Sequence, residues 1–265
     1  MSRTQIQSLL WQALPAIGGL IILVLWVVLK EAAGLQDFIL PQPNGVLEAM
    51  WTEREVLLRG ARQTFVAAIL GFVTAVTLAY IMSLILTSAA WIRQMWYPWV
   101  IIFKMVPVII LIPIFVLWMG PGIYSIIAVT FMISFFPVVA NTTMGLESTD
   151  RNLVDLFTML NASKAQEMLY LRIPNSMPYF LTGLKIAGVL APIGAITGDL
   201  FVGQSADGQA GLGLLVTVYN GQLKSEELYA TAAVASILGL VFVGTVNFLH
   251  WYFLHNWHES AVKEK

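Results

Sequence analysis

The sequence has no cysteine and few charges, since only 11% of its 265 residues are Asp, Glu, Lys or Arg. Without cysteine, the chain has no disulfide bond, no thiolate metal site and no cysteine nucleophile. Soluble globular domains carry charges at about a quarter of their residues, so this composition excludes an ordinary soluble fold. The formal net charge of −1 also argues against nucleic acid as a partner.

The sequence also lacks the residue motifs of an enzyme active site. No Ser-His-Asp arrangement and no pair of carboxylates in a plausible pocket is found, so no catalytic residue is assigned. The glycine-rich stretch 203–213 lacks GxxxxGK[ST] and follows no strand, which excludes a phosphate-binding loop. His250, His255 and His258 lie beside tryptophans at the end of a hydrophobic run, a pattern typical of an interfacial anchor rather than a metal site. We therefore expect no metal and no cofactor bound by this chain.

Hydrophobic runs are what the sequence has in abundance, with 58% hydrophobic residues and a mean hydropathy of +0.78. A run of about 20 apolar residues is long enough to cross a hydrocarbon core of about 30 Å as a helix. We expect an all-α membrane protein that forms one domain over residues 1–265. The expected spans, about six, are 13–29, 64–86, 100–119, 123–143, 179–201 and 228–251. A signal peptide is the alternative for the first run, but the run is too long and no small-x-small cleavage site follows it.

Prolines and glycines divide the remaining segments. Pro107 and Pro113 fall inside the third span, where they free backbone carbonyls, so this helix is expected to kink and to face protein or a cavity. The turn Gly120-Pro121-Gly122 ends it. Two polar regions, 30–62 and 202–226, are expected to be outer loops, and Asn44 in the first is expected to cap a helix that reaches about Leu58.

A polar segment at 147–176 lies between two hydrophobic runs. Apolar residues recur within 153–160 at helical spacing, which predicts a short amphipathic helix. Asn161 follows, and asparagine tolerates the left-handed conformation that ends helices. Ser163 and Gln166 then have the spacing of a capping box, which predicts a second short helix that ends before Pro174. The pattern predicts two short helices that meet at a sharp corner, on a docking knob at the membrane surface.

The basic residues orient these spans. With the 147–176 segment and both termini inside, nine of the 14 Lys and Arg residues fall on the cytoplasmic side, in agreement with the positive-inside rule. The inside set is Arg3, Arg93, Lys104, Arg151, Lys164, Arg172, Lys185, Lys263 and Lys265.

Three stretches of the chain resemble ABC importer permeases, over about residues 40–250. The order Asp155, Asn161, Leu171, Pro174 has the spacing of the "EAA" loop of that family, with Asp-Leu-Phe in place of Glu-Ala-Ala and Asn161 in place of its glycine. The second stretch is similar to the third membrane segment of the nitrate, sulfonate and taurine permeases, and the third is glycine-rich. Their residues are Pro107, Pro113, Trp118, Gly120 and Gly122, and then 194–203 with Gly211, Leu212 and Gly213.

The resemblance implies a type I importer permease of the branch that transports nitrate, sulfonate, taurine, pyrimidines or riboflavin. It implies a homodimer, two ATPase subunits that bind ATP and Mg, and a solute-binding protein that delivers the substrate. It also implies a bacterial inner membrane location with both termini cytoplasmic. The residues implied in coupling to the ATPase are Asp155, Leu156, Phe157, Asn161, Ala162, Ser163, Leu171 and Pro174.

The segment from Gly194 to Asp199 bears on the identity of the substrate, because it resembles the corresponding segment of the pyrimidine and riboflavin permeases. We therefore expect a neutral or weakly charged heterocycle, with nitrate, bicarbonate, taurine or an alkanesulfonate as the alternative. A self-contained carrier or channel is a rival of another class. It requires intramembrane carboxylates or histidines for ion coupling, and Asp199 is the only acidic residue near a span.

Seven residues are candidates for the translocation pathway: Lys104, Pro107, Trp118, Phe135, Asn141, Thr197 and Asp199. Lys104 either faces a cavity or extends to the cytoplasmic headgroups. Trp118 and Phe135 are able to stack on a flat ring if a cavity runs between their helices. Asn141 either faces the pathway or caps the fourth span. Asp199 either gates the entrance, contacts the delivering protein, or is simply solvated.

Overall fold

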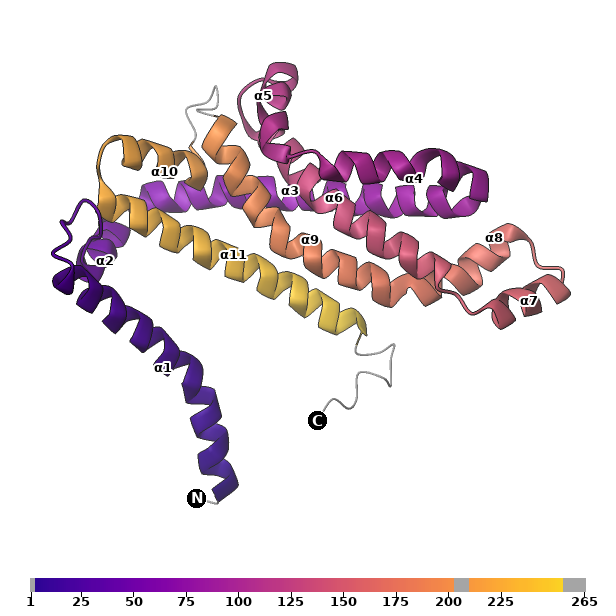
Figure 1. Cartoon of the computed structure of the whole chain (residues 1–265), viewed down its shortest axis with the longest axis horizontal. Coiled ribbons are helices and arrows are strands. Elements are labelled where there is room, and N and C mark those ends of the chain that lie inside the picture. The colour runs from indigo at the N-terminus through magenta and orange to yellow at the C-terminus, as the bar shows by residue number, and fades with distance from the viewer. Residues whose placement is uncertain (1–2, 203–209, 255–265) are drawn as a thin grey trace.

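The computed structural model describes residues 3–202 and 210–254, and within these ranges all of the regular structure is helical (Figure 1). The helices are α1 (Arg3–Ala32), α2 (Pro43–Thr52), α3 (Arg54–Ser88), α4 (Ala90–Met105), α5 (Val108–Met119), α6 (Ile123–Glu147), α7 (Arg151–Met159), α8 (Lys164–Glu167), the π-helix η1 (Met168–Arg172), α9 (Ile173–Val202), α10 (Leu212–Gly221) and α11 (Ser225–Leu254). Among the described residues, five helices are long and apolar enough to cross a membrane, and α4 with α5 gives a sixth if the bent pair is one span.

The centre of the bundle is the packing of α6 against α3 and α9. Small residues allow this close approach, since the buried alanines Ala67, Ala68, Ala75 and Ala79 lie along α3. At Gly71 on α3, an added Cβ would lie 2.5 Å from Cβ of Thr130 on α6. The backbones of these helices are therefore closer than any larger side chain permits.

The bend predicted in the third span is confirmed at Pro107, but the span is two separate helices rather than one kinked helix. α4 and α5 meet at 99°, at a break over Val106 and Pro107. Val106 is extended because the ring of a proline disfavours the helical conformation of the residue before it. Pro113, in contrast, lies inside α5 without a break. In Figure 1, α4 runs alongside α3 and α5 projects from the body of the bundle.

The two predicted outer loops also hold helices. Asn44 caps nothing, because Gln42 is the N-cap of α2 and Pro43 is at its start. α2 stops at Thr52 rather than near Leu58, and α3 begins at Arg54, well before the expected start of the second span. In the second region, α10 packs on α9, α11 and α3, and it buries Leu212, Leu215 and Tyr219.

The two ends of the bundle differ. In Figure 1, α2 and α10 lie at one end and α7 and α8 at the other, while α1 diverges from the bundle. The end of α1 is fixed by Trp26, whose ring nitrogen donates to the carbonyl of Pro41 at 3.0 Å and whose ring lies 5.5 Å from that of Tyr229. The segment between α1 and α2 is joined to α11 by Ser225, whose hydroxyl donates to the carbonyl of Phe38 at 2.5 Å.

We predict that Gly71→Ala destabilises the bundle by about 1 to 3 kcal/mol, because its Cβ would overlap Thr130. Gly239→Ala is the matched control, since no atom lies within 4 Å of a Cβ at that position of α11. The control should be neutral or stabilising, because alanine favours a helix more than glycine does. Thermal unfolding in detergent measures both, and equal midpoints would contradict the close approach.

Candidate functional site

The corner between α7 and α8 is built by local backbone chemistry. Asp150 caps α7 by accepting a hydrogen bond from the backbone of Asn152 at 2.9 Å. At the other end, Asn161 has φ of 52°, and its N–H donates to the carbonyl of Thr158 at 3.0 Å. The N–H of Ala162 donates to the carbonyl of Phe157 at 3.0 Å, which completes a Schellman motif. The predicted left-handed turn at Asn161 is confirmed.

The capping box at Ser163 is confirmed too. Its hydroxyl accepts from the backbone N–H of Gln166 at 3.3 Å, and its own N–H donates to the Gln166 side chain at 2.8 Å. The expected end of this helix before Pro174 is wrong, because α8, η1 and α9 run on as one helix from Lys164 to Val202.

The π-helix explains how the chain passes Pro174. Proline lacks an N–H and its ring collides with the carbonyl four residues earlier in an α-helix. Here the N–H of Ile173 bonds the carbonyl of Met168, five residues earlier, so the helix is widened where the proline enters. The corner at Asn161 is therefore attached directly to the helix that contains the fifth predicted span.

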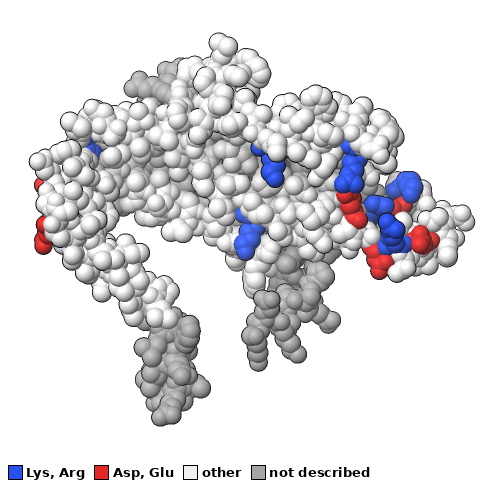
Figure 2. Space-filling model, viewed as in Figure 1, with Lys and Arg blue, Asp and Glu red and all other residues white. Residues whose placement is uncertain are grey.

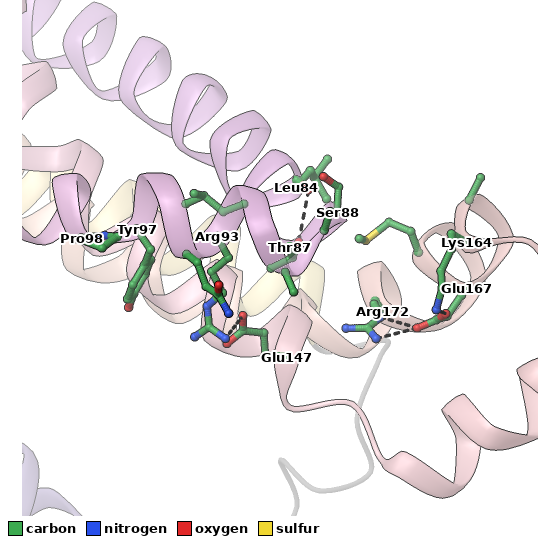
Figure 3. Close-up of a pocket in the computed structure, with 16 residues that line it drawn as sticks. Leu84, Thr87, Ser88, Arg93, Tyr97, Pro98, Glu147, Lys164, Glu167 and Arg172 are labelled. Atoms are coloured by element: carbon green, nitrogen blue, oxygen red, sulfur yellow. Dashed lines mark hydrogen bonds and ion pairs between the residues drawn. The ribbon is translucent and has the colours of Figure 1, made fainter.

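A charged cleft lies behind this corner (Figure 3). It has a volume of about 1350 Å³ and opens between the α3–α4 turn and α8 with η1. Arg93 on α4 pairs with Glu147 at the end of α6, at 2.7 Å. Across the cleft, Arg172 pairs with Glu167 at 2.6 Å, and Lys164 pairs with the same carboxylate at 3.0 Å. Figure 2 shows charges of both signs gathered at this end of the molecule, while much of the visible bundle is uncharged.

The end of α6 is held from two sides. Arg172 donates to the carbonyl of Leu146 at 3.3 Å, one of the carbonyls that a helix C-terminus leaves without an internal partner. The negative end of the helix dipole favours such a cation. Arg93 holds the neighbouring Glu147. The α8–η1 segment, α4 and α6 thus meet at one polar joint, defined by Arg93, Glu147, Glu167 and Arg172.

A second polar cluster lies toward the opposite end of the bundle. Asp199 on α9 is only 2% exposed, and Thr64 on α3 donates to its carboxylate at 2.5 Å. The Thr64 hydroxyl accepts from the N–H of Leu212 at 2.9 Å, and the backbone of Gly213 also bonds Asp199. Any side chain at Gly211 would overlap the carboxylate. This cluster joins α3, α9 and the start of α10.

Comparison with known proteins decides the family. Residues 75–255, more than half of the chain, match the binding-protein-dependent transport system inner membrane component family. The chain is an ABC importer permease of this family. It is 33% identical to the formylaminopyrimidine transport permease protein of Halalkalibacterium halodurans, over 87% of this chain and 91% of that protein. It is 27% identical to the riboflavin transport system permease protein of Chloroflexus aurantiacus, over 85% of each.

A solved structure has the same fold. The crystal structure of an amino acid ABC transporter with histidines aligns with a TM-score of 0.59 at 16% identity, over 76% of this chain and 95% of that chain. The permease therefore has the type I importer fold expected from the sequence.

The predicted coupling residues divide by exposure. Asp155, Leu156 and Ser163 are exposed, and Phe157 and Ala162 are half-buried. Leu156 lies in an exposed apolar surface that continues over Leu153, Met159 and Leu160. Leu171, another predicted coupling residue, is only 9% exposed, so its side chain packs inside the permease and is not open to a partner. Pro174 is half-buried beyond it.

The predicted pathway residues are spread over several helices of the permease. Lys104 is exposed in the last turn of α4, Pro107 forms the α4–α5 break, and Thr197 is half-buried on α9. The ring partner of Trp118 is Phe115, at 6.5 Å, whereas Phe135 contacts Phe131 and Phe136, so the structure does not pair Trp118 with Phe135.

Two interpretations of polar residues are corrected. Asn141 does not cap the end of α6, which runs on to Glu147, and its amide donates to the carbonyl of Pro137 at 2.8 Å. Asp199 is not solvated, because its carboxylate is buried against Thr64. His255, His258, Gly203 and Gly208 lie outside the described residues.

Sequence reasoning missed Glu167 and Thr64. Glu167 and Arg172 are five residues apart, a separation that brings side chains together only because the helix widens to π geometry at η1. Thr64 gave no signal beyond its place at the start of an apolar run, and its partners are more than 130 residues away.

We predict that Arg172→Ala destabilises the permease by on the order of 3 kcal/mol, because it removes the best partner of a buried carboxylate. Lys164→Ala is the control, since its side chain is 87% exposed and its pair with Glu167 should be worth less than about 1 kcal/mol. Adding Glu167→Gln to Arg172→Ala should recover part of the loss, because the amide needs no counter-ion. Thermal unfolding of the four proteins tests this, and an equal cost for both single variants would refute it.

We also predict that Thr64→Val costs on the order of 3 kcal/mol, because the buried Leu212 N–H and the Asp199 carboxylate both lose a partner. Thr74→Val, on an exposed face of the same helix, should stay within about 0.5 kcal/mol. If the unfolding midpoints of the two variants agree, the cluster does not hold α3 to α10.

Proposed function

We propose that this permease forms the translocation pathway of an ATP-driven importer for a small heterocycle such as a pyrimidine or a flavin. It works as a homodimer in the bacterial inner membrane, with both termini cytoplasmic. Two separate ATPase subunits bind ATP and Mg, and an external solute-binding protein delivers the substrate. This chain itself has no enzymatic role.

One observation carries this proposal: an exposed apolar corner attached rigidly to a long helix. Leu153, Leu156, Met159 and Leu160 leave apolar surface uncovered on α7, where the chain is otherwise polar. The Schellman motif and the capping box fix the angle to α8, and α8 continues into α9 without a break. A partner that grips α7 therefore moves α9 directly.

The polar joint extends this movement to other helices. Because Arg172 contacts both Glu167 and the end of α6, a displacement of α8 also acts on α6. α6 and α9 then move as one packed unit. ATP, by binding the closed ATPase pair more tightly than the open pair, would bias the helices between outward and inward arrangements.

The substrate class rests on two supports. The two relatives reported above transport, by their names, a formylaminopyrimidine and riboflavin, both heterocycles. The pathway candidates Trp118 and Phe135 offer aromatic faces, whereas Lys104 is the one charged side chain among them besides Asp199. The buried bonds of Asp199 to Thr64 and Gly213 also favour a structural role over the ion coupling that a secondary carrier needs.

The coupling assignment is tested by co-purification with the ATPase subunit encoded with this permease. Asn161→Val should reduce ATPase recovery at least about tenfold, because a β-branched residue is strained at positive φ. Asn161→Gly is the matched control and should retain binding, since glycine adopts this conformation without cost. Asp155→Lys should also release the ATPase, while Glu48→Lys, an exposed charge reversal at the other end of the bundle, should not.

Normal transport and ATPase binding by Asn161→Val and Asp155→Lys would overturn this assignment. Uptake by the purified permease in vesicles without any ATPase would overturn the whole proposal, and would favour a self-contained carrier.

A further inference from the structure

The first turns of α3 carry a stripe that changes from basic to apolar. Arg59 and Arg62 are exposed, and Val66, Ile69 and Val73 follow on the same face at helical spacing. All three apolar side chains are exposed in this chain. In a helix that crosses a membrane, such an order places the arginines at headgroup level and the apolar residues beside acyl chains.

A cleft lies beside the basic end of this stripe. Its volume is about 650 Å³, within the range of small-molecule sites. It is lined by Val56, Arg59, Arg62, Gln63, Val66, Ile123 and Ala210. None of these lining residues is acidic, and the polar groups that face the cleft from α3 are two guanidinium groups and one amide.

The two arginines have spare donors. Nε of Arg59 donates to the backbone carbonyl of Glu55 at 3.2 Å. Arg62 forms no ion pair with any residue in 14–202 or 210–252. The buried carboxylate of Asp199 is already bonded by Thr64 and the backbone of Gly213. Among the described residues, the guanidinium groups of Arg59 and Arg62 therefore have no acidic partner in the cleft.

We propose that this cleft binds the phosphodiester headgroup of an anionic phospholipid, such as phosphatidylglycerol, with an acyl chain along Val66, Ile69 and Val73. A guanidinium group matches two phosphate oxygens with parallel hydrogen bonds. A zwitterionic lipid fits less well, because its cationic headgroup would meet two arginines and, among the described lining residues, no carboxylate. The apolar stripe of Val66, Ile69 and Val73 favours a lipid over a free anion, because a free anion has no acyl chain to cover these side chains.

Binding would also steady the neighbouring cluster. Gln63 precedes Thr64 directly, and Ala210 lies two residues before Leu212, whose N–H bonds Thr64. A lipid in the cleft therefore contacts both segments that Thr64 joins. A ligand that binds only the folded state raises its stability.

The test is a titration of the purified permease in a neutral detergent. The probes are short-chain phosphatidylglycerol, phosphatidylcholine with the same acyl chains, and inorganic phosphate, and the readouts are the unfolding midpoint and bound lipid by native mass spectrometry. Phosphatidylglycerol should raise the midpoint and be retained, and the other two should act far more weakly. Each arginine near a headgroup strengthens anionic lipid binding roughly fivefold, so Arg59→Gln with Arg62→Gln should weaken it on the order of twentyfold.

Arg54→Gln is the matched control. Arg54 is an exposed arginine of the same helix, but its guanidinium lies over the Trp51 ring at 5.0 Å, outside the cleft. It should leave phosphatidylglycerol binding unchanged. Equal binding of phosphatidylglycerol and phosphatidylcholine, an equal effect of inorganic phosphate, or no loss in the double variant would each overturn the proposal. The wild-type comparison of the three probes decides the matter even if the double variant does not fold.

Discussion

Two carboxylates, Glu167 and Asp199, are buried in the described part of the chain, and the structure depends on how they are satisfied. Removing a carboxylate from water without partners costs several kcal/mol, so each of the two needs donors from the protein. Glu167 is held by Lys164 and Arg172, and Asp199 by Thr64 and the backbone of Gly213. Each set of donors comes from segments that must be correctly placed, so each carboxylate fixes the geometry around it.

These two clusters have different consequences because their donors differ. At the α7–α8 end, the long side chain of Arg172 on η1 connects Glu167 of α8 to the end of α6. Near the other end, a short threonine and glycine backbone hold Asp199, and no side chain fits at Gly211. The first arrangement suits the transmission of movement, and the second suits a fixed contact between α3, α9 and α10.

Much of the corner between α7 and α8 was predictable because its rules are local. The left-handed turn at Asn161 and the capping box at Ser163 follow from side chains that bond their own backbone within three residues. The six-span estimate was close for a similar reason, since hydropathy over about 20 residues decides membrane insertion. The end of the helix before Pro174 was predicted wrongly, because proline usually stops a helix and the π turn that accommodates it leaves no clear mark in the sequence.

The sequence by itself determined the class of protein, most of the hydrophobic spans and the turn at Asn161, because hydropathy, helix capping and turn preferences act between near neighbours. Only the tertiary structure decided that α4 and α5 meet at 99°, that α10 is a buried helix rather than a loop, and that Arg172 reaches α6. Contacts such as that between Thr64 and Asp199 join residues far apart in the chain. Their energy depends on how whole helices approach one another, which no local pattern contains.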